Sequence, residues 1–102
     1  METETKKFQT EKLKKVAEIL KTIAHPVRLS IIEMLANDTS LTVTELKAAT
    51  AIEQSLLSHH LIKMKDKGIL LSYREGKNSY YKLVDEHILQ IFTCMEGCTF
   101  LK

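Results

Sequence analysis

The sequence contains few residues that interrupt helices, with one proline and three glycines among its 102 residues, and it contains no tryptophan. With 44% hydrophobic residues, this scarcity excludes a collagen-like, low-complexity or disordered chain and favours a compact, helix-rich domain. No apolar run approaches the roughly 18 residues that a membrane-spanning helix needs. The lysine-rich start leads into an amphipathic segment, which is not typical of a signal peptide. We therefore expect one cytoplasmic domain with no membrane partner.

Cysteine is also scarce, with only Cys94 and Cys98 in the chain. In a reducing compartment, two cysteines are expected to pack, bind metal or undergo redox chemistry rather than form a structural disulfide. A Gly-rich phosphate loop, a nucleophile with a recognisable base and an evident carboxylate pair are all missing from the sequence. We therefore do not expect an enzyme.

The net charge of +2 is too small to indicate a polyanionic partner by itself, so its distribution matters more. Residues 1–40 carry a formal charge of +1, residues 41–82 carry +3 and residues 83–102 carry −2. The positive charge therefore gathers in the middle of the chain.

Hydrophobic spacing predicts a mainly α-helical domain with one β-hairpin. Apolar residues recur every three or four positions over residues 8–23, and His25 is expected to cap a second helix that begins at Pro26. Thr42 and Glu45 have the spacing of a capping box. The expected elements are a helix-turn-helix at residues 44–67, a hairpin at 69–83 and a last helix at 85–98.

Two short helices followed by a hairpin form a winged helix-turn-helix, in which the second helix reads DNA bases and the hairpin, or wing, contacts phosphates. Short polar side chains on the second helix can bond base edges, and basic side chains there and on the wing can bond phosphates. The alternative is a winged helix that binds only proteins. The expected base contacts are Gln54, Ser55, Ser58 and His59, and the expected phosphate contacts are Lys63, Arg74 and Lys77.

Four segments of the chain are distinctive in their order and spacing: AHPVRL at 24–29, ELKAA at 45–49, QSLLSHHL at 54–61 and REGKNSYYKL at 74–83. Together they resemble the ArsR/SmtB family of bacterial repressors. The resemblance implies a homodimer formed by the first and last helices, which binds an imperfect inverted repeat in double-stranded DNA. It also implies release from DNA by a metal ion or a thiol-directed signal.

The turn before the second helix departs from the family pattern at two positions. The family has glycine and then a serine or threonine cap, whereas this chain has Ala51 and Glu53. If Ala51 takes a positive φ, the strain costs about 1 kcal/mol. Glu53 would repel nearby phosphates, so we expect Glu53→Ser to tighten DNA binding.

The resemblance also implies where a signal is sensed. The family's thiol site near the first helix of the helix-turn-helix is absent, because residues 41–47 contain neither cysteine nor histidine. The family site on the last helix is matched at Asp85, His87 and, eleven residues further on, Cys98, whereas Leu101 occupies the position of a fourth ligand.

On a continuous last helix, His87, Cys94 and Cys98 would share one stripe. Three interpretations remain open. Asp85, His87, Cys94 and Cys98 of two chains together could bind Zn(II), Cd(II) or Cu(I), since soft metals prefer thiolates. Cys94 and Cys98 could instead respond to oxidants or reactive sulfur, or the stripe could be a plain dimer seam.

Overall fold

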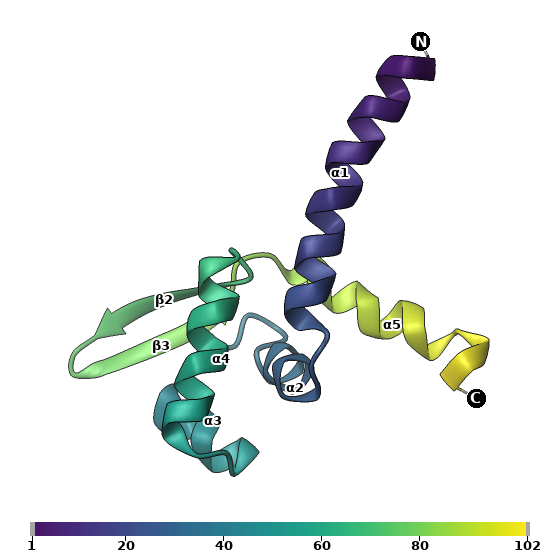
Figure 1. Cartoon of the computed structure of the whole chain (residues 1–102). Helices are drawn as coiled ribbons and strands as arrows, with labels where there is room; N and C mark the ends of the chain where they lie inside the picture. The colour runs from purple at the N-terminus through teal and green to yellow at the C-terminus, as the bar shows by residue number, and fades with distance from the viewer. Residues whose placement is uncertain (1, 102) are drawn as a thin grey trace.

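The computed structural model describes the backbone of residues 2–101 and the side chains of residues 9–101. Figure 1 shows a long first helix that projects from a cluster of shorter helices, with the hairpin extending to one side. In chain order the elements are α1 (Glu2–Ile23), α2 (Pro26–Met34), β1 (Leu41–Thr42), α3 (Val43–Thr50), α4 (Gln54–Asp66), β2 (Leu70–Glu75), β3 (Asn78–Leu83), the short 3₁₀ segment η1 (Glu86–Leu89), α5 (Gln90–Glu96) and a second 3₁₀ segment η2 (Thr99–Leu101).

The helix starts follow from local capping chemistry. The ring Nδ1 of His25 accepts a hydrogen bond of 3.2 Å from the amide of Val27, and Pro26 opens α2, as expected. The Thr42 hydroxyl accepts from the Glu45 amide, while the Glu45 carboxylate accepts from the Thr42 amide at 2.9 Å. Both expected caps are confirmed, and the second fixes where the helix-turn-helix begins.

The wing is an antiparallel hairpin, and β1 extends it to a three-stranded sheet in the order β1-β3-β2. Leu70 pairs with Leu83 at the base, and Glu75 pairs with Asn78 next to the turn. Gly76 takes φ +65° in that turn, a conformation that glycine adopts without strain. The winged helix-turn-helix fold expected from the sequence is thereby confirmed.

One core joins the helix-turn-helix to the wing. Apolar side chains from α2, α3, α4 and the base of the hairpin are buried together, and eight of them are less than 2% exposed. Burial of this kind holds α4 by one face and leaves its other face to solvent. The eight residues are Ile31, Ile32, Leu35, Leu46, Leu57, Leu61, Met64 and Leu70.

The expectation of one continuous helix over residues 85–98 is wrong. Asp85 caps η1, a 3₁₀ segment, and α5 is only seven residues long and ends at Glu96. Gly97 follows with φ −82° and ψ −5°, and Cys98 lies beyond the helix. A single helical stripe from His87 through Cys98 therefore does not form, because the tighter 3₁₀ winding and the early end change the direction of each side chain.

Candidate nucleic-acid interface

Helix α4 separates an apolar face from a polar one. Leu57, Leu61 and Met64 are fully buried against the core. The face away from the core carries the side chains that the sequence predicts for DNA contact. Gln54, Ser55, His59 and Lys63 are exposed, and Ser58 is half-buried. The structure therefore brings the five predicted residues of this helix onto one accessible side of the molecule.

The turn from α3 to α4 sets the direction of that helix. Ala51 ends α3 in the left-handed conformation, with φ 56° and ψ 28°, and its amide donates to the Lys47 carbonyl at 2.8 Å. The structure thus meets the condition under which strain at Ala51 was expected. The left-handed residue reverses the chain so that α4 can pack across α3.

Glu53 caps α4 with its own side chain. One carboxylate oxygen accepts from the Ser55 amide at 3.1 Å, and both oxygens lie within 2.7 Å of the Ser55 hydroxyl. Those hydrogen bonds, which favour the charged form, hold the pKa of Glu53 below its ordinary value. A negative charge therefore lies at the N-terminus of the predicted reading helix. It engages the proton of the Ser55 hydroxyl and leaves that oxygen able to accept a hydrogen bond from a base.

A buried histidine joins α4 to the rest of the domain. His60 is 4% exposed, and its Nδ1 accepts from Arg28 Nε at 3.0 Å, while Arg28 Nη1 donates to the Thr22 carbonyl at 2.7 Å. Burial, and then the proximity of His25 and Arg28, lowers the pKa of His60. Neither His60 nor Arg28 is among the contacts expected from the sequence.

The wing presents Arg74 and Lys77 to solvent, and Lys77 lies in the turn between β2 and β3. Tyr73 and Tyr80 face each other across the strands with ring centroids 5.4 Å apart. Stacked rings on paired strands stiffen a hairpin that has little core beneath its tip. The basic side chains of the wing are thus carried on a hairpin that the stacked tyrosines stiffen.

The loop between α2 and β1 is tied both to the base of the wing and to the segment that follows the wing. Lys82 donates to Asp38 at 2.7 Å. The amides of Asn37 and Asp38 donate to the carboxylate of Glu86 at 3.2 and 3.3 Å, and both residues have positive φ. Consecutive amides in this conformation form a concave anion site. No sequence signal beyond a polar loop pointed to this contact.

The residues proposed for sensing lie in the C-terminal part of the chain. Asp85 Oδ1 lies 2.7 Å from His87 Nδ1, and the Cys98 Sγ donates to the Cys94 carbonyl at 3.4 Å. Cys94 is exposed and Cys98 is half-buried. Within residues 9–101, no three histidine, cysteine or acidic side chains of one chain gather to hold a metal ion. A site made of all four residues would need a second chain.

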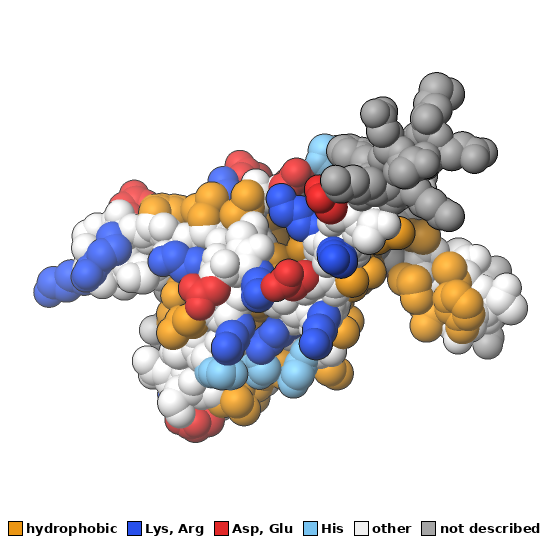
Figure 2. Space-filling view, turned by 45° about the horizontal axis from the view of Figure 1, so that its top comes forward, with side chains coloured by type: hydrophobic (Ala, Val, Ile, Leu, Met, Phe, Trp, Pro, Cys, Tyr) orange, Lys and Arg blue, Asp and Glu red, His pale blue; other side chains and the backbone are white. Residues whose placement is uncertain are grey.

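The electrostatic character of this side of the molecule is visible in Figure 2. Histidines lie in a row beside lysine and arginine side chains, and further basic side chains lie toward the wing. None of the helices in the described range is long and apolar enough to cross a membrane. Positive charge beside an exposed polar helix face suits a polyanionic partner.

Comparisons with known proteins agree with this geometry. The family model for bacterial regulatory proteins of the arsR family matches residues 25–72. A transcriptional regulator of the HTH type from Methanocaldococcus jannaschii is 34% identical over 86 residues, which cover 84% of this chain and 97% of that protein. The chain belongs to the arsR family. It is a DNA-binding transcriptional regulator, and the expectation that it is not an enzyme is confirmed by this membership.

Solved structures show the same fold. The transcriptional repressor PagR of Bacillus anthracis is 39% identical over 77 residues, 76% of this chain and 77% of that protein. Its crystal structure matches with a TM-score of 0.74 at 35% identity, covering 84% of this chain and 98% of that one. A homodimeric winged helix-turn-helix DNA-binding domain from Mycobacterium bovis matches with a TM-score of 0.73 at 27% identity, covering 86% of this chain and 81% of that one.

Proposed function

We propose that this arsR-family regulator is a cytoplasmic, homodimeric repressor that binds an imperfect inverted repeat. One observation carries the proposal: α4 is fixed by its buried leucines while its N-terminal half keeps a polar face open to solvent. Such a face fits the major groove, where amide and hydroxyl groups can bond base edges. In this proposal Gln54, Ser55, Ser58 and His59 read bases, while Lys63, Arg74 and Lys77 bind phosphates.

An unpartnered apolar surface supports the homodimer. On α1, Leu13, Val16 and Leu20 are 64%, 44% and 45% exposed, although apolar side chains at this spacing usually lie against another element. At the other end of the chain, Phe100 and Leu101 are 78% and 62% exposed. A second copy that covers both surfaces would place two reading helices at a fixed separation, as a two-fold repeat requires.

The donor chemistry supports a metal effector shared between two copies. The Asp85 carboxylate accepts a hydrogen bond from His87 Nδ1 and leaves Nε2 available, which is how an outer carboxylate commonly orients a liganding histidine. Thiolates from Cys94 and Cys98 of the partner would complete a soft-metal site suited to Zn(II), Cd(II) or Cu(I). In such a site Asp85 orients His87, and it either binds the metal as well or leaves the metal to the other three residues.

The second candidate is a redox-responsive repressor that binds no metal. The observation that favours it is the accessibility of Cys94 and Cys98, which lie on either side of the end of α5. Because Cys98 is already outside the helix, its thiol can reach a partner without unwinding a helical turn. Oxidation would then act on the C-terminal segment and weaken the dimer, or it would join the two chains.

A DNA titration tests the proposal. Fluorescence anisotropy of the reduced, metal-free protein should show tighter binding to an inverted-repeat duplex selected from random DNA than to a scrambled duplex, with affinity falling steeply as salt rises. Repeating it with Zn(II), Cd(II), Cu(I), peroxide or a persulfide identifies the effector. Salt-independent or absent binding to every duplex would favour a protein-interaction module instead.

A further inference from the structure

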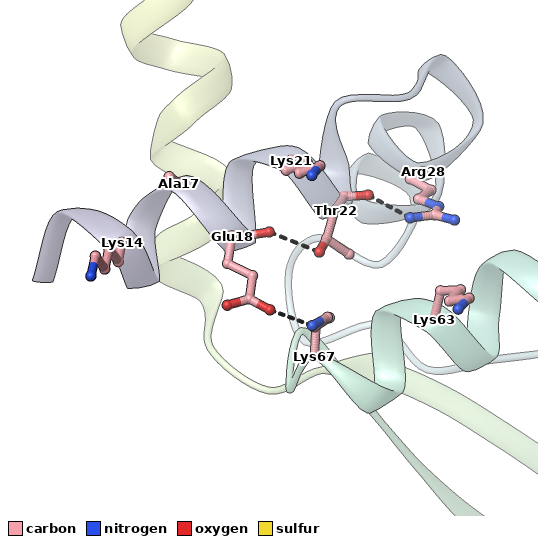
Figure 3. Close-up of a pocket in the computed structure, with 8 residues that line it drawn as sticks. All are labelled: Lys14, Ala17, Glu18, Lys21, Thr22, Arg28, Lys63 and Lys67. Carbon is pink, nitrogen blue, oxygen red and sulfur yellow. Dashed lines mark hydrogen bonds and ion pairs between the residues drawn. The ribbon is translucent and has the colours of Figure 1, made fainter. Parts of the chain in front are cut away.

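A basic hollow lies between α1 and the C-terminal half of α4, whereas the residues assigned to base reading lie in the N-terminal half of α4. It has a volume of about 570 Å³, and five of its eight lining residues are basic while one is acidic. Figure 3 shows lysines along both helices, with Arg28 of α2 at one end. The lining residues are Lys14, Ala17, Glu18, Lys21, Thr22, Arg28, Lys63 and Lys67.

Most of this positive charge is not neutralised by the protein itself. Lys67 pairs with Glu18, and Arg28 is held by His60 and the Thr22 carbonyl. Lys14, Lys21 and Lys63 are exposed, and among the described side chains none of the three has an acidic partner within ion-pair distance. Three unpaired ammonium groups around one concavity repel one another, so a bound anion with several charges would relieve that repulsion.

The position of the hollow indicates which anion fits. Ser55, His59, Lys63 and Lys67 follow one another at intervals of four residues, so they run along one side of α4. A helix of 13 residues is about 20 Å long, whereas the major groove is about 12 Å wide. When the N-terminal half of α4 lies in the groove, its C-terminal half reaches the phosphate strand that borders the groove.

We propose that the hollow is a clamp for the DNA phosphate backbone and that Lys21 of α1, together with Lys14, contacts phosphates there. Helix α1 thus contributes to DNA affinity directly, through the side that faces α4, in addition to presenting its apolar side to a second copy. The inference rests on the DNA-binding function proposed above and enlarges its footprint beyond α4 and the wing.

Lys21→Ala is the decisive variant, and Lys65→Ala is its matched control, because Lys65 is an exposed lysine of α4 that does not line the hollow. Each lost phosphate contact should reduce the slope of log affinity against log salt by about 0.9, hence by about 1.8 in a homodimer. Lys21→Ala should lower the affinity for the specific duplex and for the scrambled duplex by the same factor, since phosphates carry no sequence information. Lys65→Ala should leave the slope near that of the wild type.

A second variant should change DNA affinity in the opposite direction. Glu18→Gln removes the carboxylate from the hollow and frees Lys67, so it should tighten binding to both duplexes and steepen the slope. Glu33→Gln, an exposed carboxylate of α2 outside the hollow, removes the same charge and is its control. Circular dichroism and sedimentation of each variant verify that fold and oligomeric state are unchanged.

The outcomes separate the two proposals. If the wild type binds DNA with a steep salt dependence but Lys21→Ala and Lys65→Ala give equal slopes, the clamp is rejected while the function stands. If Lys21→Ala leaves the salt slope of DNA binding unchanged but abolishes direct binding of inorganic pyrophosphate to the protein, the hollow is a small-anion site and the clamp is likewise rejected. If the wild type binds no duplex, the proposed function itself fails.

Discussion

Ala51→Gly should stabilise this protein, although glycine substitutions usually destabilise folded domains. Ala51 has φ 56° and ψ 28°, and its amide holds the last hydrogen bond of α3 to the Lys47 carbonyl. In this left-handed region the Cβ of an L-residue crowds the backbone at a cost of roughly 1–2 kcal/mol, whereas glycine adopts the conformation freely. The substitution therefore removes strain and leaves the hydrogen bond in place.

The gain is reduced by the effect of glycine on the unfolded chain. Glycine's extra backbone freedom there costs roughly 0.4–1 kcal/mol of stability. The net gain in the free energy of unfolding is therefore up to about 1.6 kcal/mol, with a central value of about 0.8 kcal/mol. For a domain of about 100 residues, 1 kcal/mol corresponds to a rise in Tm of roughly 4–8 °C.

Urea denaturation followed by circular dichroism measures this difference, at one protein concentration for all variants because dimerisation would contribute to stability. Ala48→Gly is the matched control: Ala48 is exposed, lies three residues earlier and belongs to the regular part of α3. Its replacement should destabilise the protein by about 1 kcal/mol, the usual cost of glycine within a helix. The two variants should therefore change stability in opposite directions.

A loss of stability in Ala51→Gly as large as that in Ala48→Gly would refute the reasoning. It would mean that the turn is not strained at Ala51 in solution, or that the alanine methyl contributes packing that offsets the strain. Equal slopes of free energy against urea in the three proteins are needed for the comparison, since a changed slope signals a change in the exposed surface instead.

Three further predictions concern the interface, pH and the thiols. Glu53→Ser should tighten DNA binding several-fold at matched salt, because it removes a charged carboxylate while serine still caps α4; unchanged or weaker binding would contradict this. Because the pKa of His60 is lowered by burial, the unfolded chain binds a proton that the folded chain resists, so stability is complete above about pH 6.5, the ordinary value, and falls as pH drops below it. The free energy of unfolding, measured by urea denaturation at a series of pH values, should depend less on pH in His60→Gln than in the wild type. His87→Gln, which replaces an exposed histidine, is the control and should keep the pH dependence of the wild type. Replacing Cys94 and Cys98 with serine should preserve the DNA affinity of the reduced, metal-free protein and abolish its effector response in the anisotropy titration; a surviving response would place the input elsewhere.

The helix-turn-helix and wing could be predicted because their signals are local. The capping box at Thr42 and Glu45, the His25 cap before Pro26 and the apolar spacing of α4 all act within a few residues, and each is seen in the structure. For Ala51 the sequence set only a condition, a positive φ where the family has glycine, and the structure meets that condition.

The last segment was predicted less well, because its residues form a weak helix. The spacing of His87, Cys94 and Cys98 was compatible with one helix, but the observed chain forms a 3₁₀ segment, a short α5 and a further turn. A short helix depends on packing more than on propensity. The spacing could not show which conformation would prevail there.

The sequence by itself determined the order of elements as far as the wing, the winged helix-turn-helix and the candidate contacts on α4, since those follow from periodicity and capping within one element. Only the tertiary structure decided what lies side by side: the buried Arg28 and His60 pair, the Glu86 carboxylate on the amides of Asn37 and Asp38, and the basic hollow between α1 and α4. These contacts join residues 32 to 49 positions apart. No local pattern specifies such separations, because burial of the shared core sets them.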